Sequence, residues 1–181
     1  MRQNSTPECK NGTPCDVKLA GALVLTSQGV PFLHSGVEFC RTKNGNGNSY
    51  KSPDSINQIV WHRKVEFQDV FEYYSKLIQL RKNHPAFRIT TAEGIRQNLH
   101  FCTEYKIGVV SYCIDGAPVG DTWTKILLIF NGSPKDVNVP IPEGNFKIIA
   151  NGDKISESGL GQIESNEVSV AGISMLLLVT D

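Results

Sequence analysis

The sequence predicts a mixed fold, in which a helix, a short strand, a long loop and a second helix precede an antiparallel β-sandwich. Three observations lead to this class. A helical pattern at residues 17–28 ends at Gly29 and precedes a short apolar run, 30–35, that is typical of a strand buried on both faces. A second helical pattern at 66–82 is stopped by Pro85. After this proline, short apolar runs alternate with turn residues.

The apolar run at residues 30–35 has the character of a strand in a parallel sheet. Asp16 is expected to cap the helix that comes before it. A parallel strand needs neighbouring strands and helices on both faces, and the sequence offers only one such strand. We therefore expect this part to be a piece of a larger unit. The alternative places the run in the later antiparallel sheet, which leaves the preceding helix without a role.

The long stretch at residues 36–61 is polar, rich in Gly and Asn, and has no regular period. Segments of this length inside compact domains are typically either functional or disordered. Because Tyr50, Ile56, Ile59 and Trp61 supply apolar anchors, we expect an ordered functional loop.

The chain after Pro85 is dominated by strand patterns. One or two helical turns are expected at residues 91–98 before the first strand. The boundary between the two parts falls near 85–87, which predicts units of 1–85 and 86–181. About seven short strands at this spacing indicate an antiparallel sandwich. The expected strands are residues 99–102, 107–114, 125–131, 135–141, 145–150, 167–170 and 174–179.

Composition and charge exclude several kinds of partner. The chain has 40% hydrophobic and 20% charged residues, which is ordinary for a globular protein. Lys plus Arg equals Asp plus Glu, at 18 each, so no long-range field attracts phosphates. We therefore expect no nucleic-acid partner. No apolar run has the length of a membrane span, and we expect none. The cellular compartment stays open.

The cysteine pattern predicts neither a metal site nor a cofactor. There are five cysteines, and none of the spacings has the CxxC form of a metal site. Cys102 and Cys113 lie in strand-like runs and are expected to be buried free thiols. Cys9 and Cys15 flank a Gly-Thr-Pro turn, where a small disulfide and two free thiols are both open alternatives. No calcium-type loop is evident.

Residues 25–39, LTSQGVPFLHSGVEF, resemble the last barrel strand of the α-amylase superfamily of glycoside hydrolases. The sequences RTK at 41–43, NSY at 48–50 and SPDSINQ at 52–58 narrow the resemblance to type I pullulanases, which are bacterial starch-debranching enzymes. The exit segment at 80–88 also matches. The resemblance runs through most of the chain.

Two further features belong to this resemblance. Residues 126–132, a strand that ends in Asn-Gly, resemble the all-β C-terminal domain of the same enzymes. Val60 departs from the family, which usually has an Asp before Trp61. Because Val60 has no carboxylate, the resemblance carries no role over to this position.

The resemblance implies a fold, an activity and an incomplete catalytic site. Residues 1–85 become the final strand, loop and helix of a (β/α)8 barrel, and 86–181 become the β-sandwich. Such enzymes cleave α-1,6-glucosidic branches of pullulan, amylopectin or limit dextrins with two carboxylates roughly 5 Å apart. In the family these carboxylates lie on earlier barrel strands, so no catalytic residue is expected here and the isolated chain is predicted to be inactive. The implied partners are the α-glucan substrate and the missing part of the barrel.

The loop after the barrel-type strand would face the active site. We expect substrate contacts from its aromatic and polar side chains, which are Arg41, Asn48, Tyr50, Asp54 and Asn57. For two of these a structural role is the open alternative. Asn48 is also explained as a turn residue, and Asp54 as a helix cap. Four other residues are expected to have structural roles: Glu38, Trp61, His34 and His84.

Two other functions remain as alternatives. One is a non-catalytic β-sandwich that binds carbohydrate or docks to a partner. It is disfavoured by the barrel-type strand, loop and helix before Pro85, for which such a module has no use. The other is an isoamylase-like or glycogen-debranching hydrolase, which differs mainly in linkage preference. Because residues 1–85 would expose apolar faces made for missing neighbours, we also expect self-association.

Overall fold

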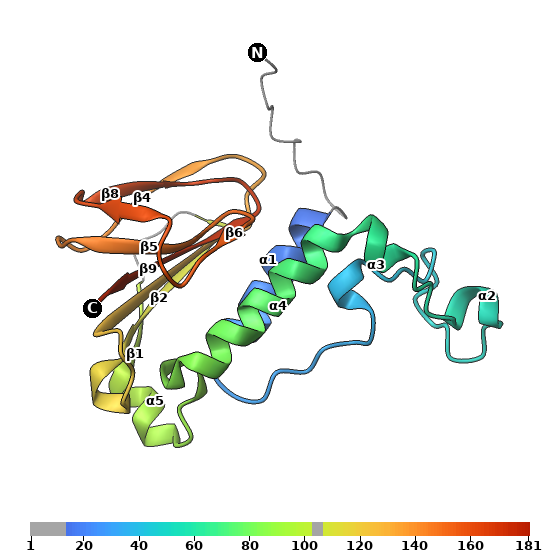
Figure 1. Ribbon diagram of the computed structural model, residues 1–181, viewed down its shortest axis with the longest axis horizontal. Coiled ribbons are helices and arrows are strands. Elements are labelled where there is room, and N and C mark those ends of the chain that lie inside the picture. Colours follow the sequence, from blue (N-terminus) through green and yellow to red (C-terminus); the bar gives the residue numbers. More distant parts are fainter. Residues whose placement is uncertain (1–13, 103–106) are drawn as a thin grey trace, which may run out of the picture.

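The computed structural model describes residues 14–102 and 107–181 of the chain. Two long helices lie side by side against one face of an antiparallel sheet, and the segment with two short helices projects away from that sheet (Figure 1). The helices are α1 (Pro14–Thr26), α2 (Asp54–Asn57), α3 (Arg63–Glu66), α4 (Gln68–Asn83) and α5 (Ala92–Asn98), with short 3-10 turns η1 (Val37–Phe39), η2 (Pro85–Arg88) and η3 (Ala117–Val119). The strands are β1 (Leu99–Phe101), β2 (Val109–Asp115), β3 (Lys125–Asn131), β4 (Val137–Pro140), β5 (Phe146–Asn151), β6 (Lys154–Ile155), β7 (Gly161–Ile163), β8 (Glu167–Val170) and β9 (Ser174–Thr180).

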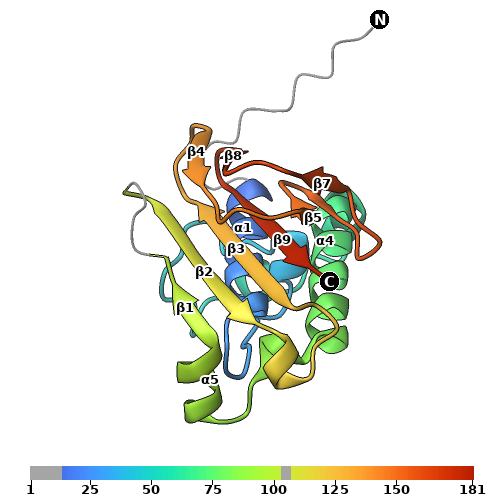
Figure 2. The same ribbon diagram turned by 90° about the vertical axis from the view of Figure 1, so that its left-hand side faces the viewer.

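The strands form one large sheet and one small one. The large sheet has the order β1-β2-β3-β9-β5-β6, with β7 paired to β5, and the small sheet contains β4 and β8. The described pairings are antiparallel. Figure 2 shows β2, β3 and β9 crossing in front of α1 and α4, so the helices cover the far face of the large sheet.

Strand β3 is apolar on both faces because each face packs against a different layer of the structure. Because side chains alternate along a strand, its even-numbered residues and its odd-numbered residues face different layers. Ile126, Leu128 and Phe130 pack with the helices. Leu127 and Ile129 pack with the small sheet. Complete burial of each such side chain stabilises the fold by about 1.5–3 kcal/mol.

The packing of α1 on α4 depends on a glycine and an arginine. A Cβ added to Gly21 would lie 2.4 Å from Tyr74 Cζ, so only glycine admits the tyrosine ring at this point. Arg81 of α4 donates from one guanidinium nitrogen to the carbonyl oxygens of Leu25, at 2.9 Å, and Ser27, at 2.7 Å. These bonds satisfy carbonyl groups that the end of α1 leaves free. Burial lowers the pKa of Arg81.

The strand expected at residues 30–35 is absent, and this prediction is wrong for the chain by itself. The segment has no strand pairing and leaves Val30 96% exposed and Phe32 87% exposed. The physical reason is that a parallel strand takes its hydrogen bonds from neighbouring strands. Among the described residues no strand lies beside this one.

The first helix was expected at residues 17–28 with Asp16 as its cap, but α1 begins at Pro14 and Asp16 lies within its first turn. The remaining elements agree with the sequence patterns, with local differences. The expected helix at 66–82 is broken at Phe67, where φ is −113° and ψ is 43°, into α3 and α4. The helical turns expected at 91–98 form α5, capped by Thr91, whose hydroxyl accepts from the Gly94 N–H. Strands β6 and β7 are additional and short.

The helices and the large sheet share one hydrophobic core. Its members include Leu77 and Leu80 of α4 together with Ile149 and Leu177 of the sheet. The parts of the chain before and after residues 85–87 therefore pack closely on one another.

The free cysteines agree with expectation in part. Cys102 and Cys113 are free, as predicted, but half-buried. Burial, followed by the neighbouring Cys102 thiol, raises the pKa of Cys113 to about 12. Cys15 is disulfide-bonded. Cys9, which the sequence paired with it as one alternative, lies outside the described residues.

Candidate functional site

The 36–62 loop is closed at its base by hydrogen bonds to the backbone carbonyls of Gly36 and Cys40. Gly36 begins it with φ 90°, and a Cβ there would lie 2.9 Å from Arg41 Cβ. The Arg41 N–H donates to the Gly36 carbonyl at 2.9 Å. At the other end, Arg63 Nε and a terminal guanidinium nitrogen donate to the Cys40 carbonyl, at 3.0 and 2.7 Å. The chain thus returns to its starting point, and the loop projects from this base (Figure 1).

Asn57 organises the interior of the loop. Its Nδ2 donates to the carbonyl oxygens of Ser49 and Ser52, both at 2.7 Å. Its Oδ1 accepts from Lys43 Nζ at 2.6 Å. The Ser52 N–H also donates to the Ser49 carbonyl at 3.0 Å, so the two serines close a tight turn with Tyr50 at its tip.

Arg41 connects this network to the segment before the loop. One guanidinium nitrogen donates to the Ser35 carbonyl at 3.1 Å, and the other donates to the Asn57 carbonyl. Desolvation, reinforced by the Arg41 charge, lowers the pKa of Lys43. Arg41 Nε is buried and has no hydrogen-bond partner among the described residues.

The other three predicted substrate residues lie on the surface of the loop. Tyr50 is 80% exposed, with the Lys51 ammonium 5.5 Å from its ring centre. Asn48 is exposed, and its N–H donates to Asn46 Oδ1 at 3.0 Å, as expected for a turn residue. Asp54 is exposed in the first turn of α2, whose N-cap is Pro53 rather than the aspartate. Arg41 and Asn57 differ from these three residues, because their side chains hold the loop together through hydrogen bonds to its backbone. We call these bonds the frame of the loop.

Sequence reasoning missed how the frame is built. It did not identify Lys43, or the serine carbonyls that Asn57 holds, because side-chain bonds to distant backbone groups leave no periodic signal. The one available signal was the gathering of Asn and Ser around Tyr50, since such residues hydrogen-bond to nearby backbone.

The residues expected to have structural roles behave differently from one another. Glu38 lies in η1 and is half-buried. Trp61 packs on Phe39 with ring centres 5.9 Å apart but is still 69% exposed. His34 was expected in the core and is exposed, because the strand that would bury it does not form. His84 lies at the C-terminus of α4, as expected.

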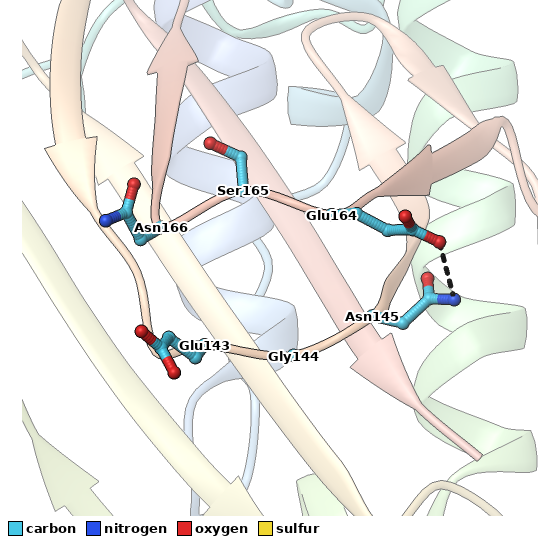
Figure 3. A pocket seen from close by; sticks show the side chains of 6 residues that line it. All are labelled: Glu143, Gly144, Asn145, Glu164, Ser165 and Asn166. Atoms are coloured by element: carbon cyan, nitrogen blue, oxygen red, sulfur yellow. Dashed lines mark hydrogen bonds between the residues drawn. The ribbon is translucent and has the colours of Figure 1, made fainter.

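A second feature is a shallow hollow of about 580 Å³ on the β-sheet part of the molecule. Figure 3 shows its polar side chains, where Asn145 Nδ2 donates to Glu164 Oε1 at 3.3 Å. The lining contains no aromatic ring that a sugar would stack on. The lining residues are Glu143, Gly144, Asn145, Glu164, Ser165 and Asn166.

The described residues provide binding groups but no metal centre. Within 14–102 and 107–181, no group of three His, Cys, Asp or Glu side chains is placed to hold a metal ion. None of the helices in these ranges has both the length and the apolar character of a membrane span. The 36–62 loop offers the exposed rings of Tyr50 and Trp61, amide groups and a carboxylate, which suits binding of a polyhydroxylated ligand.

Comparison with known proteins places this geometry in a family. Residues 95–154 match the model of the pullulanase all-beta domain. A curated pullulanase of Bacillus subtilis (strain 168) is 44% identical over 125 residues, which cover 69% of this chain. The solved pullulanase of Bacillus acidopullulyticus superposes with a TM-score of 0.87 at 42% identity over 97% of this chain. The chain belongs to the pullulanase family.

Pullulanases and their relatives are starch-debranching glycoside hydrolases, and the resemblance stated from the sequence is confirmed. An isoamylase from a Flavobacterium species is 27% identical over 140 residues, covering 67% of this chain and 18% of the relative. The chain spans 17% of the B. subtilis pullulanase and 22% of the solved B. acidopullulyticus chain, so it corresponds to part of such an enzyme.

Several solved relatives carry glucan ligands. The pullulanase of Paenibacillus barengoltzii, solved in complex with maltohexaose and alpha-cyclodextrin, superposes with a TM-score of 0.83 at 36% identity. The alignment covers 97% of this chain and 27% of that pullulanase.

Proposed function

We propose that this chain supplies a substrate loop and a β-sandwich to an enzyme that hydrolyses α-1,6-glucosidic branches in pullulan, amylopectin or limit dextrins. The observation that carries the proposal is Tyr50, an aromatic ring that is 80% exposed at the tip of a hydrogen-bonded turn. An exposed ring held rigidly costs a ligand little ordering entropy on binding. Solved relatives hold maltooligosaccharides, which supports an α-glucan as the ligand.

The proposal assigns residues 1–85 to a (β/α)8 barrel and 86–181 to the sandwich that packs on it. Val30 and Phe32 are exposed directly before the loop, Trp61 near its end is 69% exposed, and Val65 just after it is 71% exposed. Soluble proteins rarely leave large contiguous apolar surfaces uncovered. The rest of the barrel would cover these side chains and supply the strands that residues 30–35 lack.

The 36–62 loop contributes binding and orientation in this proposal. Tyr50 offers its ring to a sugar face, and Asn48 and Asp54 offer hydrogen bonds to hydroxyl groups. Arg41 and Asn57 act beside them. Arg41 Nε is a buried donor without a partner in the part of the chain that the structure describes. Because buried donors in native proteins are normally bonded, the complete enzyme or its substrate is expected to supply an acceptor.

The chemistry itself is assigned to the rest of the enzyme. A retaining glycosidase needs two carboxylates about 5–5.5 Å apart, one as nucleophile and one as acid and base. We assign neither role to a residue of this chain, so the isolated chain is expected to be inactive. Its side chains would hold the glucan against those carboxylates.

The test is a chimeric enzyme in which this chain replaces the matching segment of the B. subtilis pullulanase. We expect the chimera to release reducing sugar from pullulan. Tyr50→Ala should raise KM about tenfold, equivalent to about 1.4 kcal/mol, with kcat unchanged. Tyr50→Phe is the matched control, because it keeps the ring and should keep KM. An unchanged KM in Tyr50→Ala would overturn the assignment of the loop.

A further inference from the structure

The turn that carries Tyr50 is held by a side chain from outside it. Ser49 and Ser52 are the first and last residues of this turn, and their carbonyl oxygens both lie 2.7 Å from Asn57 Nδ2. The turn's own bond, from the Ser52 N–H to the Ser49 carbonyl, is 3.0 Å long. The amide of Asn57 therefore ties together the two ends of the turn.

From this geometry we infer that Asn57 is a positioning residue, which fixes the Tyr50 turn in the orientation that meets the glucan. The inference rests on the proposed function and changes the role expected for Asn57 there. Both amide hydrogens of Nδ2 are used by the serine carbonyls, and Oδ1 is used by Lys43. The amide therefore has no free donor for a sugar hydroxyl.

The surroundings of Asn57 hold it in place on a second side. Arg41 donates to the Asn57 main-chain carbonyl and, at 3.1 Å, to the Ser35 carbonyl. The Asn57 N–H donates to the Pro53 carbonyl at 3.1 Å, at the end of the short helix α2. Because the main chain of Asn57 is fixed by these bonds, its side chain holds the Tyr50 turn in one position relative to the rest of the loop.

An isosteric substitution separates this role from folding. Asn57→Asp keeps the size of the side chain and keeps an oxygen facing the Lys43 ammonium, which lies 2.6 Å from Oδ1. It removes both donors and places a carboxylate oxygen against the two serine carbonyls. The base of the loop at Arg63 and Cys40 does not involve Asn57 and should stay closed.

The first experiment measures amide hydrogen exchange in this chain. In Asn57→Asp the Ser52 N–H should exchange about tenfold faster than in the wild type, while amides of α4 keep their rates. Asn138→Asp is the matched control, because Asn138 is an exposed asparagine on β4. An unchanged Ser52 rate in Asn57→Asp overturns the inference.

The second experiment is a double-mutant cycle in the chimeric enzyme with pullulan as substrate. Asn57→Asp should raise KM about fivefold with kcat unchanged, and should add nothing in the Tyr50→Ala background. An equal increase in both backgrounds means that Asn57 acts without Tyr50, and overturns the inference. If Tyr50→Ala alone leaves KM unchanged, the proposed function fails, and the exchange rate of Ser52 still decides whether Asn57 holds the turn.

Discussion

The junction between α4 and the sheet should depend on a single buried carboxylate, that of Asp121. Its side chain is fully buried, and Oδ1 lies 2.8 Å from His84 Nδ1 and accepts from the Trp123 N–H at 3.0 Å. Oδ2 accepts from the Ala86 N–H at 3.0 Å. The His84 ring also stacks on Trp123, with ring centres 3.3 Å apart. One side chain thus joins the end of α4 to the segment before β3.

Asp121→Ala should therefore destabilise the chain strongly. It leaves His84 and two buried N–H groups without an acceptor, and at about 1–3 kcal/mol for each unsatisfied buried group the loss should be about 3–5 kcal/mol. Asp121→Asn keeps the shape and one acceptor oxygen, and should cost about 1–3 kcal/mol. Equilibrium urea unfolding measures both. With a slope of about 2 kcal/mol per molar urea, the midpoint of Asp121→Ala should fall by about 1.5–2.5 M.

The control is Asp69→Ala, which removes an aspartate whose side chain is 63% exposed in a surface pair with Lys18. Such exposed pairs contribute about 0–1 kcal/mol. If Asp121→Ala lost no more stability than Asp69→Ala, the carboxylate would not join helix and sheet, and the reasoning would be refuted.

Three further predictions concern packing, titration and exposed apolar surface. Gly21→Ala places a Cβ 2.4 Å from Tyr74 Cζ. The overpacking should cost about 1–3 kcal/mol, which exceeds the gain of about 1 kcal/mol from the higher helix propensity of alanine. The free energy of unfolding measured in urea should therefore fall. Gly47→Ala, in open space, is its control, and a stabilised Gly21→Ala would contradict the packing. Because burial raises the pKa of Cys113 to about 12, its thiol is neutral at pH 8. Alkylation of Cys113 by iodoacetamide at this pH should therefore be about a thousandfold slower than alkylation of free cysteine. The rate should increase with pH up to pH 12, as the reactive thiolate forms. If Cys113 were alkylated as fast as free cysteine, its thiol would not be buried as the structure shows. Phe32→Gln should change the free energy of unfolding of this chain by less than about 0.5 kcal/mol, because the ring is 87% exposed, yet lower pullulan hydrolysis by the chimera. A loss of more than about 1 kcal/mol in the chain alone would show that Phe32 packs within it.

The regular elements were predictable where the periodicity of the sequence reports on burial. Residues 125–131 and 174–179 are continuous apolar runs, and both are central strands covered on two faces. The helix at 66–82 was predicted from its apolar face, but its break at Phe67 was not. Boundaries of this kind depend on local backbone angles that hydrophobic periodicity does not report.

The failures have a common physical cause, which is that long-range partners leave no local pattern. Residues 30–35 read as a strand, yet a strand exists only where a neighbour supplies its ladder. His84 was expected at a helix end, but its partner Asp121 lies in the connection before β3. In the loop, the bonds of the Asn57 amide to Lys43 and to the carbonyl groups of the turn likewise left no local signal in the sequence.

The central claim is that this chain works as part of a larger debranching hydrolase that holds the catalytic carboxylates. The most direct test is to isolate the native protein from the source cells with an antibody raised against this chain. The account predicts a protein several times heavier than 19.9 kDa that cleaves pullulan. A native protein of about 19.9 kDa without hydrolase activity would contradict it.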